Sequence, residues 1–244
     1  MRRLGCRVIL YLGLLLAAAN VRAQVSGSFA LLSDYRYRGV SLSDRGPALQ
    51  GGVAYDHGSG LYAGVLASTV HINGADSSLG AQFYAGYAHL LDQRVSLDAG
   101  AARYLYPDSP TRGSYDYTEL YAGVARDRLH ARLHYSDGYF GTSAQTIYAE
   151  INTALDLGEI DLGKIDPGKI VVLAAHVGYL KRWGQSAYSS APRAQWDVRL
   201  GLGTELAGLT VELSVVATDV PSDQCPGSDR ACAPGLVLSI GRDF

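Results

Sequence analysis

Apolar and polar residues alternate with a period of two along most of the chain. Between residues 145 and 157, Ile147, Ile151 and Leu155 share one parity, whereas Glu150 and Asn152 share the other. Period two is typical of a β-strand, because successive side chains point to opposite faces. Turn residues separate about twelve such segments, at 26–40, 47–57, 60–70, 78–91, 94–106, 115–127, 128–140, 145–157, 169–182, 193–205, 208–219 and 234–244. The pattern therefore predicts an all-β chain.

The connections between these segments alternate in length. The turns after the second, fourth, sixth and tenth segments are short, whereas those after the first, third, fifth, ninth and eleventh are longer and polar. Outer-membrane barrels have short periplasmic turns and long extracellular loops. A soluble β-sandwich explains the alternation of side chains but not this asymmetry. We therefore predict a transmembrane, antiparallel, up-and-down β-barrel of about twelve strands.

The first 23 residues have the pattern of a secretory signal peptide. Three arginines (Arg2, Arg3 and Arg7) surround the start of an apolar run, which ends before the cleavage pattern Val21-Arg22-Ala23. The run is too short to span a membrane. We expect residues 1–23 to be removed and residues 24–244 to form one barrel domain in outer-membrane lipid. Removal of the signal takes away these three arginines and Arg22, so the net charge falls from −2 to −6. This negative charge argues against a nucleic-acid partner.

Charged residues alternate with tyrosines in the stretch "SDYRYRGVS" at 33–41. In a barrel strand, this parity sends Tyr35 and Tyr37 toward lipid and the charges into the lumen. We expect the two tyrosines to join Tyr135, Tyr179, Trp183 and Trp196 in an interfacial aromatic belt. The predicted lumen lining consists of Asp34, Arg36, Arg38, Asp98, Glu119, Arg132, His134, Glu150, Asp197, Arg199 and Glu212.

A mixed-charge lumen is compatible with more than one function. Paired charges could fill a narrow interior as a structural ladder, or they could line a pore and select solutes. The first hypothesis is a passive, porin-like channel for small solutes. A structural or adhesive barrel remains an alternative.

The segment "LHYSDG" at 133–138 offers an enzymatic alternative. It is similar to the His-x-Ser-Asn segments of outer-membrane phospholipase A and the lipid A deacylases, in which a histidine activates a serine on the same strand. His134 and Ser136 share a face, as such a pair requires. Their parity is opposite to that of Leu133 and Tyr135, so they should face the lumen and not lipid. We therefore expect no enzyme activity and keep a lipid esterase as the alternative.

The cysteines and the remaining histidine pair give no indication of catalysis or of a metal site. Cys225 and Cys232 lie in a polar loop of an exported chain, so a disulfide is expected. Four residues on a strand span roughly 13 Å, which is too far for His130 and His134 to share a metal. We expect neither metal nor cofactor.

The segment "SGSFALLSDYRYRGVSLSDRGPALQGGVAYDHGSGLYAGVLAS" at 26–68 resembles the start of the Gcw_chp family of exported bacterial proteins. "SDGYFG" at 136–141 is similar to a second family segment, and the chain ends in "LVLSIGRDF", whose terminal Phe244 resembles the assembly signal of outer-membrane barrels. The resemblance implies an outer-membrane barrel and a contact between Phe244 and the barrel-assembly machinery. It implies no activity, substrate or catalytic residue.

Processing of the signal gives the first testable prediction. Mature protein should begin at Gln24 and fractionate with outer membranes, which N-terminal sequencing and membrane fractionation would measure. An intact Met1 terminus, or soluble periplasmic protein, would contradict the predicted architecture.

Overall fold

The computed structural model describes residues 24–72, 78–107, 115–160, 169–184, 192–225 and 228–244. The predicted signal peptide lies outside these residues. Among the described residues, no helix is long and apolar enough to cross a membrane.

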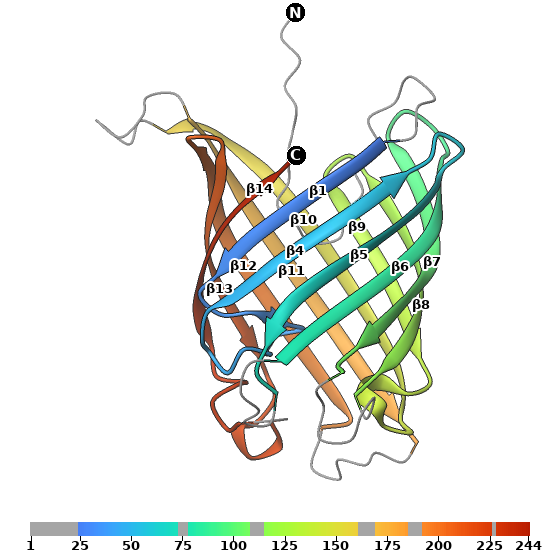
Figure 1. Ribbon diagram of the computed structural model, residues 1–244, viewed down its shortest axis with the longest axis vertical. Coiled ribbons are helices and arrows are strands. Elements are labelled where there is room, and N and C mark those ends of the chain that lie inside the picture. Colours follow the sequence, from blue (N-terminus) through green and yellow to red (C-terminus); the bar gives the residue numbers. More distant parts are fainter. Residues whose placement is uncertain (1–23, 73–77, 108–114, 161–168, 185–191, 226–227) are drawn as a thin grey trace, which may run out of the picture.

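Twelve antiparallel strands form one closed barrel (Figure 1). Each strand pairs with the next along the chain, and β1 pairs with both β4 and β14 to close the ring. This confirms the predicted fold. The strands are β1 (Gln24–Leu32), β4 (Ala48–Asp56), β5 (Leu61–Val70), β6 (Ser78–Leu90), β7 (Val95–Leu105), β8 (Tyr117–Arg126), β9 (Leu129–Ser136), β10 (Gln145–Ile160), β11 (Lys169–Trp183), β12 (Ala194–Leu206), β13 (Leu209–Thr218) and β14 (Gly235–Asp243).

The outer surface of the barrel is apolar. Leu133, Leu200 and Val215 are each about half exposed, as are many other outward-facing aliphatic residues. Such a surface favours contact with hydrocarbon over contact with water. Trp196 is 51% exposed, and its ring centroid lies 4.6 Å from that of Tyr179 on the neighbouring strand.

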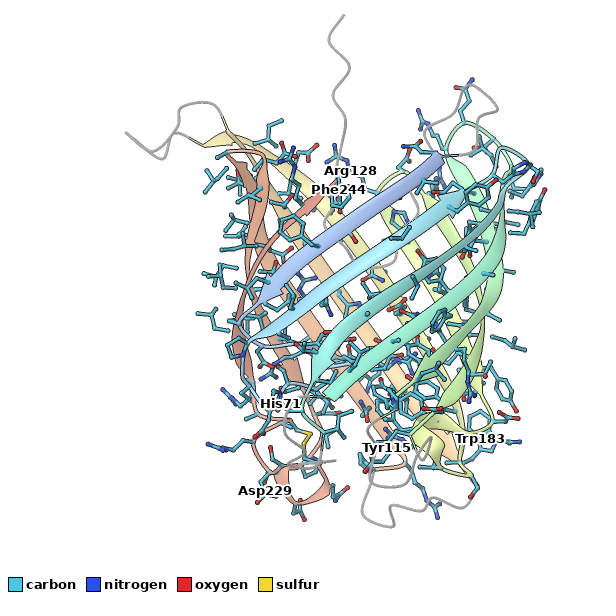
Figure 2. All side chains as sticks on the ribbon, viewed as in Figure 1. His71, Tyr115, Arg128, Trp183, Asp229 and Phe244 are labelled. Atoms are coloured by element: carbon cyan, nitrogen blue, oxygen red, sulfur yellow. A yellow bond between two sulfur atoms is a disulfide. The ribbon has the colours of Figure 1, made fainter. Side chains whose placement is uncertain are left out.

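The two ends of the barrel differ. Both chain ends of the barrel, marked by Gln24 in β1 and by Phe244, lie at the end that carries the short turns (Figure 1). Arg128 and Phe244 are at this end, whereas Tyr115 and Trp183 are at the opposite end, which carries the longer loops (Figure 2). By the rule for outer-membrane barrels, we expect the longer loops to be extracellular.

The predicted first strand, 26–40, is wrong beyond Leu32. The chain leaves the barrel wall there and forms a small hairpin of β2 (Arg36–Tyr37) and β3 (Val40–Ser41), which pair only with each other. The two residues between these strands, Arg38 and Gly39, have positive φ angles of 51° and 81°. A two-residue turn with positive φ at both positions is the preferred connection of a tight hairpin. The local turn therefore overrides the period-two pattern.

The hairpin folds into the barrel interior, so its tyrosines do not face lipid. Tyr35 and Tyr37 pack against a cluster of buried tyrosines and aliphatic residues. Their predicted place in the aromatic belt is therefore wrong. The charges of the hairpin do lie inside the barrel, but on this inserted segment and not on the wall, since Asp34, Arg36 and Arg38 are all buried.

A disulfide between Cys225 and Cys232 closes the loop that covers the hairpin. Val40 of β3 packs in a small apolar cluster with Val220, Ala231 and Cys232. The backbone N–H of Ser41 also donates to the Ala231 carbonyl at 2.9 Å. The disulfide loop therefore braces the hairpin from the extracellular side.

This geometry predicts a local effect of breaking the disulfide. The loss of so short a ring should cost roughly 2–3 kcal/mol in the loop. Because the loop is outside the strand ladder, Cys225→Ser/Cys232→Ser protein should keep the barrel, measured as a heat-modifiable shift on gel electrophoresis. Loss of that shift, or free thiols in protein from native membranes, would contradict the prediction.

Candidate functional site: the inserted hairpin and the lumen wall

Arg38, at the tip of the hairpin, is held by a buried ion pair with Glu119 of β8. Its Nη1 lies 2.8 Å from Glu119 Oε1, and its Nη2 donates to Oε2 at 2.8 Å. The guanidinium also lies 3.9 Å from the ring centroid of Tyr148 and 4.8 Å from that of Tyr37. Both charged side chains are at least 96% buried. One hydrogen bond, a second close charge contact and flanking aromatic faces stabilise the buried guanidinium, whose Nε and Nη1 have no hydrogen-bond partner among the described residues.

Arg36 anchors the base of the same hairpin. Its Nε donates to Asp34 at 2.7 Å, and its Nη1 donates to the carbonyl of Ala233 at 2.8 Å. Asp34 in turn accepts a hydrogen bond from Ser41 Oγ at 2.6 Å. These contacts join the two hairpin strands to each other and to the end of the disulfide loop.

Aromatic side chains fill the barrel interior beside the hairpin. The rings of Tyr104 and Tyr117 stack with centroids 4.4 Å apart, and Tyr37 contacts both through its hydroxyl group. Burial raises the pKa of the Tyr37 phenol well above its ordinary value, so this group is neutral at physiological pH. Phe140 packs against Tyr37 and Tyr117. The hairpin and this cluster therefore pack together inside the half of the barrel that carries the longer loops (Figure 2).

Carboxylates and imidazoles alternate around the wall from β8 to β12. His134 lies 3.3 Å from both Glu119 and Glu150, through its two ring nitrogens. His176 Nδ1 lies 3.9 Å from Glu150, and its Nε2 lies 2.8 Å from Asp197. We call these five side chains the carboxylate–imidazole row. His176 Nδ1 also lies 2.7 Å from Asn152 Oδ1, so the two imidazoles connect the three carboxylates through contacts between neighbouring strands.

Two further ion pairs lie on the wall. Arg132 donates to Asp98 at 2.6 Å, and Arg199 pairs with Glu212. The structure thus places all eleven predicted lumen residues inside the barrel. It brings most of them together in pairs between neighbouring strands or between wall and hairpin.

Three residues of the site were not predicted. His176, Asn152 and Tyr148 interact with one another or with Asp197 across three neighbouring strands. Their inward parity was visible in the sequence. Their association depends on strand register, since Asn152 is opposite His176, and Gly178 is opposite Asp197.

A cavity of about 190 Å³ lies between the hairpin and the wall. Arg36 and Arg38 line it from the hairpin, and Glu150, His176 and Asp197 line it from the wall. Aliphatic side chains, including Val216 and Val237, cover another part of its surface. The cavity therefore offers charged and apolar contacts to a small molecule.

The geometry of His134 and Ser136 does not resemble an activated nucleophile. Ser136 is almost fully buried, and its Oγ accepts a hydrogen bond from the Gly138 backbone at 3.3 Å. The ring nitrogens of His134 are both directed to carboxylates. Among the described residues, no group of three or more His, Cys, Asp or Glu side chains is arranged to hold a metal ion.

The chain belongs to the Gcw_chp family, described as bacterial protein of unknown function, whose model matches residues 17–244. No curated protein matches it. Its fold is similar to that of several solved outer-membrane proteins. The KdgM porin is 12% identical, with 90% of this chain and 98% of the porin covered at a TM-score of 0.52.

The NanC porin is 10% identical, with 89% of this chain and 98% of the porin covered at a TM-score of 0.53. An outer-membrane channel from Pseudomonas putida F1 is 14% identical, with coverages of 93% and 97% and a TM-score of 0.49. At these identities the similarity to the two porins shows the fold, which is that of an outer-membrane barrel.

Docking of the hairpin depends on Gly39, and this dependence is testable. A Cβ at Gly39 would lie 2.7 Å from Thr218 Cβ and 2.9 Å from Asp197 Cβ. Gly208 has a similar φ of 78°, but a Cβ there would meet nothing within 4 Å. Gly208→Ala should therefore cost only the backbone strain, about 1–2 kcal/mol. Gly39→Ala should add the cost of displacing the wall, about 1–3 kcal/mol.

Limited proteolysis of refolded protein measures the difference. Gly39→Ala should make the segment 33–46 susceptible to cleavage, whereas Gly208→Ala should leave it as protected as in the wild type. Equal protection in the two variants would contradict the tight docking of the hairpin.

Proposed function

We propose that this protein is a passive outer-membrane conduit for small solutes, and that the hairpin narrows its extracellular half. One observation carries the proposal: the barrel encloses a cavity lined by charged side chains from both hairpin and wall. A barrel that served only as a scaffold would gain more stability from apolar packing, because burying charges costs free energy even when they are paired.

The hairpin is the element that would control passage. It is not part of the wall ladder, so it can move without breaking the barrel. Its tip is held to the wall by the Arg38–Glu119 pair, and its base is held to the loop by Arg36 and Ser41. Removing one partner of a buried ion pair is destabilising by about 3–5 kcal/mol, since the other charge remains buried. Loss of Glu119 should therefore favour an undocked hairpin.

Conductance in planar bilayers tests this proposal. Wild-type protein should give small discrete steps, and Glu119→Gln should enlarge them several-fold because Arg38 loses its partner. Glu205→Gln provides the control, since Glu205 is exposed near the periplasmic end of β12 and outside the cavity. Absence of steps in all three proteins would contradict the conduit. Equal steps in wild type and Glu119→Gln would contradict control by the hairpin.

The esterase alternative has its own test. Because His134 and Ser136 face the interior, we expect purified protein to hydrolyse neither phospholipid nor lipid A. Lipid hydrolysis that Ser136→Ala abolishes would overturn this expectation and favour the esterase.

A further inference from the structure

The carboxylate–imidazole row holds more negative charge than its permanent cation can balance. It contains three carboxylates, and Arg38 neutralises only Glu119 among them. Glu150 and Asp197 are instead partnered by His134 and His176. Two negative charges therefore remain whenever both histidines are neutral, and they are balanced only when both are protonated.

The other interior cations are engaged as well. Arg182 donates to the Pro192 carbonyl and to Gln195, and it is not among the residues that line the cavity. Arg36 pairs with Asp34, Arg132 with Asp98, and Arg199 with Glu212. Each of these pairs is neutral as a unit. The excess charge is therefore located at Glu150 and Asp197, both of which line the cavity.

The rest of the cavity surface consists of the paired guanidiniums of Arg36, Arg38, Arg132 and Arg199 and of less polar side chains. The apolar part defines the kind of cation that would fit. Leu66, Val216 and Val237 line it together with Tyr121. An apolar wall opposite carboxylates suits a molecule that has a hydrocarbon body and an N–H-bearing cationic head. A bare metal ion would gain nothing from the aliphatic wall.

We propose that the cavity is a binding site for a small organic monocation, an ammonium or guanidinium compound, held by Glu150 and Asp197. The cation competes with a proton on His134, since either kind of positive charge balances Glu150. The assignment of this cation as a transported solute rests on the proposed conduit, whereas its binding does not.

Competition with protons sets the direction of the pH dependence. A proton on His134 adds positive charge beside Glu150 and therefore weakens cation binding. The charged or titratable groups facing His134 are Glu119, Tyr121, Arg132, Tyr148, Glu150 and Arg38, and those facing His176 are Tyr148, Glu150, Asp197 and Arg199.

Calorimetric titration of refolded full-length mature protein with butylammonium chloride tests the site. We expect binding at pH 8.5 that is at least tenfold weaker at pH 5, with no comparable binding of butyrate or butanol. Asp197→Asn preserves shape and removes one charge, so it should weaken binding at pH 8.5 at least tenfold. Asp56→Asn makes the same charge change on β4, away from the cavity lining, and should leave affinity unchanged.

Glu150→Gln serves as the second variant if Asp197→Asn does not refold, as judged by the heat-modifiable gel shift. Equal binding of butylammonium and butyrate, or equal affinity in the Asp197 and Asp56 variants, would overturn the site. So would tighter binding at pH 5.

Reversal potentials in bilayers separate this inference from the proposed function. Butylammonium binding without any conductance would support the site and contradict the conduit. Conductance with neither binding nor cation preference would support the conduit and overturn the site.

Discussion

The interior of the barrel is organised around the ion pair between Arg38 and Glu119. A guanidinium at a positive-φ position of a hairpin tip is costly to bury, and here contact with a carboxylate and with aromatic faces offsets that cost. Because Glu119 belongs to the wall, the pair fixes the position of the whole hairpin. The position of the hairpin inside the barrel and the shape of the cavity beside it both depend on this ion pair.

The two faces of the barrel wall have different surroundings, which are hydrocarbon on the outside and polar side chains on the inside. On the outer face, aliphatic side chains are exposed because they contact the hydrocarbon of the membrane. Inside, the carboxylates and cations are close enough to require partners, and the closed ladder leaves no free strand edge to supply them. Side chains on neighbouring strands and on the hairpin therefore satisfy one another, which explains the many interior ion pairs.

The histidines give this interior a variable charge. An arginine keeps its proton at any physiological pH, so the arginine pairs are constant. His134 and His176 instead contact carboxylates of neighbouring strands, and a proton on either imidazole would change the charge of that part of the wall. The barrel thus combines an ion pair of constant charge, which holds the hairpin, with nearby histidines whose charge can change.

The barrel and the face on which each wall side chain lies follow from the amino-acid sequence alone. Alternation with period two fixes which side chains share a face, and the boundaries of β4 to β14 follow the turn residues to within a few positions, except that β9 ends at Ser136 and not at 140, and β10 extends to Ile160. The strand count and the inward direction of Glu119, Glu150 and Asp197 were therefore accessible without coordinates.

The position of residues 33–41, in contrast, depends on contacts that form only in the folded chain. The alternation of tyrosines and charges there is the same in a wall strand and in a hairpin, and the turn at Arg38 and Gly39 distinguishes the two only once its backbone angles are known. Pairing also depended on register, because parity says which face a side chain occupies but not which neighbour it meets. The contact of His176 with Asp197, and that of Arg38 with Glu119 over 81 residues of sequence, come from the closure of the sheet and the insertion of the hairpin, which no local pattern encodes.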